Sequence, residues 1–195
     1  MQTDSADVDL VGDEVVVNLA RAGLFAALTG AFAYVSFPNP LSAAGLPVTL
    51  QVLGVFLAGI FLGPLWGGFS MVLYILTGAA GTPVFEGGGA GIGVLVGPTG
   101  GYIWAFPVAA ALIGLVVHGG LTLRAPGETG LLALLVGMGL GVGVIYAAGV
   151  AGLMIVLGLG PAAAFTAGAA PFVPAELFKI AAAIGLVRSD AVVAR

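Results

Sequence analysis

The sequence predicts an all-α integral membrane protein with six transmembrane helices, and its composition and length support this. Of the 195 residues, 60% are hydrophobic and 7% are charged, whereas an ordinary soluble domain has about 25% charged residues. The apolar residues extend from about residue 15 to the end of the chain, so they do not form one anchor beside a soluble domain. A span with its connection takes roughly 27–30 residues, because about 20 apolar residues cross the bilayer. Six spans therefore fit the chain.

Prolines delimit the first three helices. The first span is expected over residues 15–36, because Pro38 follows it and cannot continue a helix. Pro47 and Pro64 each suit the first turn of a helix. The second and third spans are therefore expected to meet in a tight hairpin at Gly63 and Pro64.

A glycine-rich segment separates the third span from the fourth. Residues 82–99 hold six glycines and two prolines, too many for a spanning helix. The fourth helix is expected to begin after Thr99, and the sixth at Pro174. The six expected spans cover residues 15–36, 47–63, 64–80, 101–117, 130–157 and 174–187.

The distribution of basic residues predicts the orientation in the membrane. With six spans, one side receives four arginines, which are Arg21, Arg124, Arg188 and Arg195. The three segments on the other side, residues 37–46, 82–99 and 158–173, hold neither Lys nor Arg. The positive-inside rule then places both termini in the cytoplasm and the protein in the cell membrane. The expected domains are an acidic cytoplasmic tail (1–14), a membrane domain (15–188) and a cytoplasmic C-terminal tail (189–195).

The three outer segments are long, apolar and rich in Gly and Pro. Irregular backbone near membrane depth must be buried in protein or line a cavity, because lipid offers its N–H and C=O groups no partner. We therefore expect these loops to cover a ligand pocket on the outer face.

The composition argues against several classes of function. The chain has no Cys, one His, five Lys and Arg, and nine Asp and Glu. It therefore lacks thiolate chemistry, histidine metal motifs and a basic surface for nucleic acid. An intramembrane enzyme would have no evident nucleophile or metal triad, so we expect a protein that is not an enzyme and needs no cofactor or metal.

Lys179 and Glu176 are the leading site candidates. Lys179 is the only Lys in the chain and lies within the sixth span, where an ionisable group costs roughly 2.5–3.5 kcal/mol on insertion scales. Residues at i and i+3 share a helix face. The two groups could simply neutralise each other, or they could bind the N–H and C=O groups of a urea-like or amide-like ligand.

Other polar groups cluster at the outer ends of the helices. Thr49 and Gln51 open the second span, where Thr49 could cap the helix and Gln51 could bind a ligand. In GPTGGY, Thr99 could cap the fourth helix, and the N–H groups of Gly100 and Gly101 could hold a carboxylate. These glycines could instead allow tight helix packing.

A loop and several aromatic residues complete the candidate site. Residues 84–89 include Phe85, Glu86 and Gly88 and form either a flexible lid or an ordinary surface loop. Four aromatic side chains could be interfacial belt residues or pocket walls; they are Tyr74, Tyr102, Trp104 and Tyr146.

The first helix carries two adjacent lines of small residues at four-residue spacing. One line is Ala22, Ala26 and Gly30, and the other is Gly23, Ala27 and Ala31. Such lines allow close helix approach in lipid. One line is explained by internal packing, while two suggest a smooth face that docks a separate subunit.

Taken together, four motifs resemble the biotin-specific S component (BioY) of energy-coupling-factor (ECF) vitamin transporters. In chain order they are PVTLQVLGVFLAGIFLGP, LYILTGAAGTPVFEGG, GVLVGPTGGYIWAFPVAAALIG and PFVPAELFKIAAAI, and the resemblance covers roughly residues 22–184. It implies capture of biotin at the outer face. It also implies a transmembrane coupling subunit and two cytoplasmic ATPases as partners. An S component for thiamine or riboflavin, or a small channel or structural protein, is the alternative.

The resemblance also implies roles for individual residues. It places Thr49, Gln51, Tyr74, Phe85, Gly88, Thr99, Gly100, Gly101, Tyr102, Tyr146, Glu176 and Lys179 around the ligand. It assigns the small-residue face of the first helix to docking of the coupling subunit, through Ala22, Ala26, Ala27, Gly30 and Ala31. The chain departs from the family pattern at Glu176, where Asp is usual, and at Glu86, where a small residue is usual.

Overall fold

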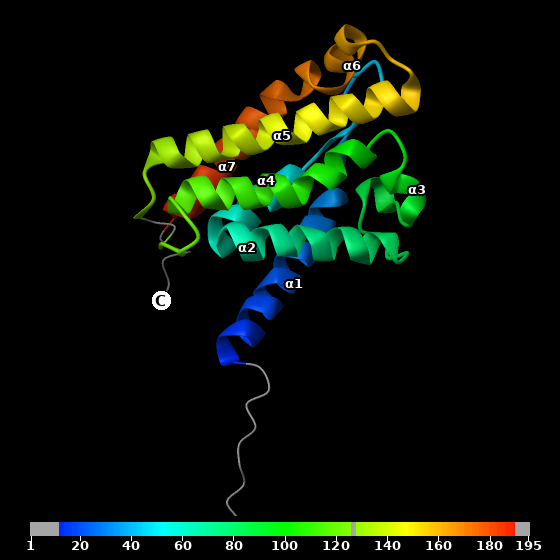
Figure 1. Ribbon diagram of the computed structural model, residues 1–195. Helices are drawn as coiled ribbons and strands as arrows, with labels where there is room; N and C mark the ends of the chain where they lie inside the picture. The colour runs from blue at the N-terminus through cyan, green and yellow to red at the C-terminus, as the bar shows by residue number, and fades with distance from the viewer. Residues whose placement is uncertain (1–11, 126–127, 190–195) are drawn as a thin grey trace, which may run out of the picture.

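The computed structural model describes residues 12–125 and 128–189, and these form an assembly of helices (Figure 1). Its long helices are α1 (Asp13–Ala33), α2 (Gln51–Ala79), α4 (Gly100–His118), α5 (Leu131–Leu157) and α7 (Val173–Arg188). The shorter elements are β1 (Ser36–Phe37), β2 (Val48–Thr49), η1 (Glu86–Gly88), α3 (Ile92–Leu95), α6 (Pro161–Gly168) and η3 (Ala170–Phe172). Five helical segments are long and apolar enough to cross a membrane, with α6 to α7 counted as one. The expected acidic tail lies largely outside the described residues, as do Arg195 and most of the expected C-terminal tail.

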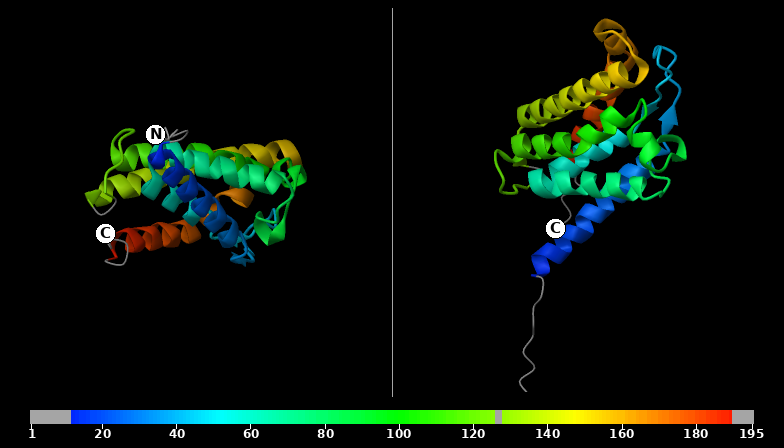
Figure 2. Two further views of the ribbon diagram at one scale, coloured as in Figure 1. Left: turned by 90° about the horizontal axis from the view of Figure 1, so that it is seen from below. Right: turned by 45° about the vertical axis from the view of Figure 1, so that its right-hand side comes forward.

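The helices α2, α4 and α5 lie side by side, and α1 crosses α2 on the opposite side from α4 (Figures 1 and 2). The N-terminal half of α1 extends away from the other helices. Helix α7 packs against α2 and α5, and α6 packs against the end of α5. The β1–β2 hairpin reaches towards α6, where Ser42 Oγ donates to the Ala167 carbonyl over 2.8 Å.

The chain reverses direction inside α2. Gly63 has φ 73° and ψ −173°, a left-handed conformation that an L side chain rarely adopts. Gln51 Nε2 lies 2.6 Å from the Tyr74 hydroxyl, whereas a straight helix would separate these two residues by about 34 Å. The expected hairpin at Gly63 and Pro64 is therefore confirmed. We call residues 51–62 the first arm of α2 and residues 64–79 the second arm.

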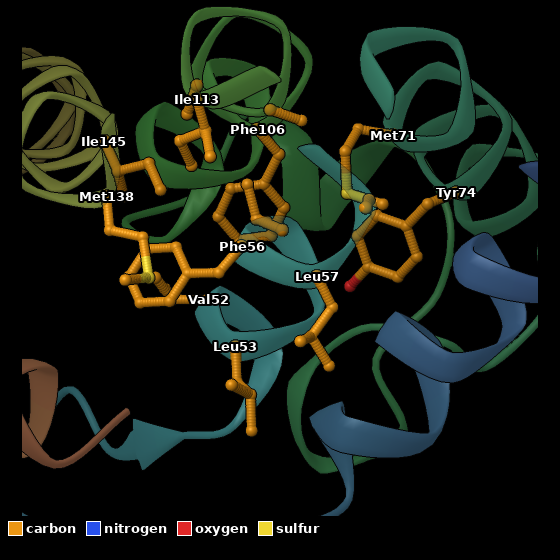
Figure 3. Close-up of a cluster of buried hydrophobic side chains, with 14 of the residues drawn as sticks. Val52, Leu53, Phe56, Leu57, Met71, Tyr74, Phe106, Ile113, Met138 and Ile145 are labelled. Carbon is orange, nitrogen blue, oxygen red and sulfur yellow. The ribbon is translucent and has the colours of Figure 1, made fainter. Parts of the chain in front are cut away.

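The first arm is the central helix of the fold. Every residue from Gln51 to Ile60 is buried, as expected for a helix that is apolar around its whole circumference. Figure 3 shows its side chains meeting those of the second arm, α4 and α5. The residues labelled there are Val52, Leu53, Phe56, Leu57, Met71, Tyr74, Phe106, Ile113, Met138 and Ile145.

The single histidine supplies a hydrogen bond that the backbone lacks where α2 reverses direction. Pro64 has no N–H, so the Ile60 carbonyl four residues earlier lacks its helical donor. His118 Nδ1 accepts the Arg124 backbone N–H over 3.0 Å, so Nε2 carries the proton and donates to the Ile60 carbonyl over 3.0 Å. His118 is buried and is the last residue of α4.

We expect His118→Leu to destabilise the fold. The change leaves the buried Ile60 carbonyl without its donor, and an unpaired buried group costs about 1–3 kcal/mol. Thermal unfolding of the purified protein in detergent measures the effect. His118→Gln is the matched control, because its amide keeps one donor and one acceptor and should retain part of the stability. An unchanged midpoint for His118→Leu would contradict this role.

Two of the expected irregular segments contain a short helix, and one of these is the four-residue helix α3 in segment 82–99. The sequence predicts that residues 158–173 are non-helical, but Pro161 begins the eight-residue helix α6. Pro161 fits the first turn of a helix, and a run of alanines follows it. Segment 37–46 is irregular as expected, and its flanks pair as the two-residue strands β1 and β2.

Candidate ligand-binding site

A pocket lies at the start of the first arm of α2, among β2, η1, α4, α5 and α7. Polar and charged side chains line it together with apolar ones. The polar lining residues are Thr49, Gln51, Glu86, Thr99, Tyr102, Tyr146, Glu176 and Lys179. The apolar lining residues are Leu46, Pro47, Val52, Ile103, Phe106, Ile145 and Phe172.

Glu176 and Lys179 form a buried ion pair in this pocket. They lie on adjacent turns of α7, and Lys179 Nζ is 2.7 Å from Glu176 Oε1. Glu176 is 3% exposed and Lys179 is 2% exposed. The Tyr146 hydroxyl on α5 donates to the same Oε1 over 2.8 Å. Two donors therefore share one carboxylate oxygen.

The second oxygen of Glu176 has no such partner. Among the described residues, Glu176 Oε2 is one of two buried side-chain oxygens without a hydrogen bond, the other being Thr129 Oγ1. A buried acceptor without a donor is costly, more so when it is charged. Lys179 has three N–H donors, of which the ion pair uses one. The pair can therefore take a ligand that presents N–H to Oε2 and C=O to Nζ.

A chain of hydrogen bonds holds the opposite wall. Thr49 Oγ1 donates to Gln51 Oε1 over 2.9 Å, and Gln51 Nε2 donates to the Tyr74 hydroxyl over 2.6 Å. Tyr74 in turn donates to the Val84 carbonyl over 3.0 Å. Tyr74 is buried behind Gln51 and does not line the pocket, so it contacts the site through Gln51.

The GPTGGY turn contributes side chains rather than open N–H groups. Thr99 and Tyr102 line the pocket, but Thr99 makes no side-chain cap. The Gly100 N–H is bonded to the Gly97 carbonyl over 3.0 Å. A Cβ at Gly100 would meet the backbone of Leu95, and one at Gly101 would meet the Ala148 carbonyl on α5. The Gly100 N–H is thus already paired and both glycines allow close packing, while the carboxylate site at this turn stays a prediction.

The loop after α2 is anchored rather than free. The Phe85 ring is fully buried and packs on Gly78, where a Cβ would overlap it. It also contacts Tyr74 edge-on, with ring centroids 5.5 Å apart. Glu86 lines the pocket, whereas Phe85 and Gly88 do not. Phe85 therefore anchors the start of this loop to α2, and the role of the loop as a lid stays a prediction.

The family model for BioY matches residues 2–194. The chain belongs to the BioY family. It is 43% identical over 99 residues to "Biotin transporter BioY" of Thermotoga maritima, covering 51% of this chain and 56% of the relative. It is 43% identical over 100 residues to "Biotin transporter BioY" of Rhodobacter capsulatus, covering 51% and 52%. The matched part thus spans about half the length of these curated relatives.

A solved structure shares the fold. The BioY-family chain described here matches an S-component for biotin from an ECF-type ABC transporter with a TM-score of 0.78. The match covers 91% of this chain and 92% of the other, at 22% sequence identity. Family membership and the five apolar helices identify a multi-pass membrane protein.

The aromatic residues of this BioY-family chain divide between pocket and surface. Tyr102 and Tyr146 pack edge-to-face with centroids 5.8 Å apart, and Phe172 contacts Tyr146 at 5.9 Å. The Tyr102 hydroxyl donates to the Gly168 carbonyl over 2.8 Å, which ties α4 to α6. Trp104 is 56% exposed and lies outside this pocket.

The two small-residue lines of α1 have different surroundings. Ala22, Ala26 and Gly30 are buried inside the molecule. Ser70 Oγ donates to the Ala22 carbonyl over 2.8 Å, so this line packs on α2. This line therefore contributes to packing within the molecule, and docking of a separate subunit on α1 stays a prediction. Ala27 and Ala31, with Gly23, remain exposed.

Sequence reasoning missed the apolar lining. Residues such as Val52, Ile103 and Phe172 carry no chemical signal in a chain that is 60% hydrophobic. A second hollow between α2, α3 and α4 is lined by apolar residues alone and offers no polar group for a specific ligand.

Proposed function

We propose that this chain is the substrate-binding (S) component of an ECF-type biotin transporter. It captures biotin at the outer face for uptake driven by partner ATPases, and is not itself an enzyme. The observation that carries the proposal is the buried Glu176–Lys179 pair with an unpartnered carboxylate oxygen, set in a pocket lined by both polar and apolar side chains. The names of the curated relatives and of the structural neighbour support it.

The chemistry of biotin matches this pair. The ureido ring offers N–H groups to Glu176 Oε2 and a C=O to Lys179 Nζ, and charge-assisted hydrogen bonds of this kind are the stronger ones. The sulfur-containing ring and the aliphatic tail suit apolar walls such as Phe172, Ile145 and Val52. The ligand then pairs the groups that burial leaves unpaired.

We assign two roles to the candidate residues. The residues proposed to contact the ligand are Thr49, Gln51, Thr99, Tyr102, Tyr146, Glu176 and Lys179. The residues proposed to support the pocket lining without contacting the ligand are Tyr74, Phe85, Gly88, Gly100 and Gly101. This division follows the lining of the pocket and the contacts of the remaining residues.

The proposed topology has six spans with both termini in the cytoplasm. The reversal at Gly63 divides α2 into two arms, so the five apolar segments provide six crossings. The pocket then faces outward, on the side whose loops hold no Lys or Arg.

A calorimetric titration of the purified protein with biotin tests the function. Saturable binding that an excess of thiamine or riboflavin does not displace is the expected result. Displacement by either vitamin would instead assign another substrate, and conductance without saturable binding would indicate a channel.

The proposed partners are a transmembrane coupling subunit and two ATPases. We expect Ala27→Trp to reduce co-purification with the coupling subunit, because the bulky ring replaces a small residue on the exposed line of α1. Biotin binding should not change. Ala147→Trp makes the same replacement at an exposed position of α5 and serves as the control. Normal assembly of the Ala27 variant would remove this face as the docking surface.

A further inference from the structure

Glu86 brings a second carboxylate into the pocket. It lies in η1 and accepts a hydrogen bond from Ser36 Oγ on β1, at 3.2 Å. Ser36 pairs in the β ladder with Thr49, which also lines the pocket. The buried Phe85 ring fixes the backbone beside Glu86. The carboxylate is therefore held in place against the wall that carries Thr49.

This carboxylate lies at the shallower part of the pocket. Glu86 is half-buried, whereas Glu176 and Lys179 are almost completely buried. A ligand whose polar ring binds at the ion pair must extend its tail towards the more exposed part, past Glu86.

The charges that line the pocket do not balance at this end. The described lining residues carry one ammonium, Lys179, and two carboxylates, Glu176 and Glu86. Lys179 is bonded to Glu176, so the lining supplies no cation for Glu86. Ser36 donates one hydrogen bond to Glu86 and adds no charge.

We propose that Glu86 makes this pocket select biotin derivatives whose carboxyl group is joined to an amine as an amide, above all those with a cationic tail, over free biotin. The proposal rests on the proposed biotin-binding function. A free tail carboxylate meets a like charge at Glu86, a neutral amide meets none, and an ammonium is attracted. Since the site is partly solvated, the difference between acid and cationic amide should be on the order of tenfold in affinity.

Three ligands that differ only in the tail test the selection. They are biotin, its primary carboxamide and its amide with ethylenediamine, each titrated into the purified full-length protein. The expected order of affinity is cationic amide, then neutral amide, then free acid. Glu86→Gln preserves the shape and an acceptor for Ser36, and it removes only the repulsion of the tail carboxylate, so it should strengthen biotin binding about threefold. It should weaken the cationic amide and leave the neutral amide unchanged. Glu128→Gln removes an exposed carboxylate outside the pocket and should change none of the three.

Other outcomes overturn the inference in distinguishable ways. If the wild-type protein prefers free biotin and Glu86→Gln leaves the ratios unchanged, the selection is absent while the biotin function stands. If Glu86→Gln weakens all three ligands equally, Glu86 holds the ring and not the tail. If none of the three binds the wild-type protein, the proposed function fails together with the inference.

Discussion

Replacing Lys179 by methionine should lower the affinity for biotin by roughly ten- to a hundredfold or more, because hydrogen bonds to charged groups contribute about 1.5–3 kcal/mol each. Lys179 supplies the ammonium that faces the ureido carbonyl in the proposed complex. It also balances the buried Glu176 carboxylate, 2.7 Å away. A calorimetric titration of the detergent-solubilised variant measures the loss.

A double variant separates binding from folding in this experiment. Lys179→Met alone leaves a buried carboxylate without its cation, and breaking a buried pair in this way costs about 3–5 kcal/mol of stability. The double variant Glu176→Gln with Lys179→Met removes both charges and should recover the unfolding midpoint without recovering biotin binding. Biotin affinity within a factor of about three of the wild type in the double variant would contradict the assignment.

Gly149→Ala should lower the affinity for biotin by displacing a side chain that lines the pocket. A Cβ at this position of α5 would overlap the Tyr102 ring, so the ring must move. Tyr102 lines the pocket, packs on Tyr146 and is bonded to Gly168 of α6, so its displacement disturbs three contacts. Overpacking costs about 1–3 kcal/mol, which corresponds to roughly a five- to hundredfold loss of biotin affinity if all of it appears in binding.

A glycine on the same helix provides the matched control. A Cβ added at Gly143 would meet no atom within 4 Å, so Gly143→Ala should leave binding unchanged and should not lower the unfolding midpoint. Both variants are measured by biotin titration and thermal unfolding. Equal behaviour of the two would show that the contact between Gly149 and Tyr102 is not required.

The sequence predicts the helices well where prolines and glycines interrupt them. The hairpin at Gly63 and Pro64 is present, and α4 and α5 agree with the expected spans to within one residue at each end. Helix α6 is not predicted, because a short alanine-rich segment between two loops has no hydrophobic periodicity to reveal it. The hydrogen bond between His118 and the Ile60 carbonyl requires contact between residues far apart in the chain, which one sequence does not show.

The sequence predicts the charged residues of the candidate site, because charged residues are rare in this chain. Glu176 and Lys179 stand out in a chain with 7% charged residues, and the structure brings them into one pocket. Gly100 and Gly101 are ambiguous, because a glycine that exposes its N–H and one that admits a neighbouring helix look the same in sequence. The two lines on α1 differ only in orientation, which depends on how α1 crosses α2.

The short first arm of α2 has a consequence for the surrounding lipid. Its 1.5 Å rise per residue gives it a length of about 18 Å, while the hydrocarbon core of a bilayer is about 30 Å thick. In the proposed topology, the polar groups at its start therefore lie below the level of the lipid headgroups. Such hydrophobic mismatch is relieved by local thinning of the bilayer, at a modest cost per ångström. Bilayer thickness should accordingly influence how readily water and solutes reach the recessed end of this arm.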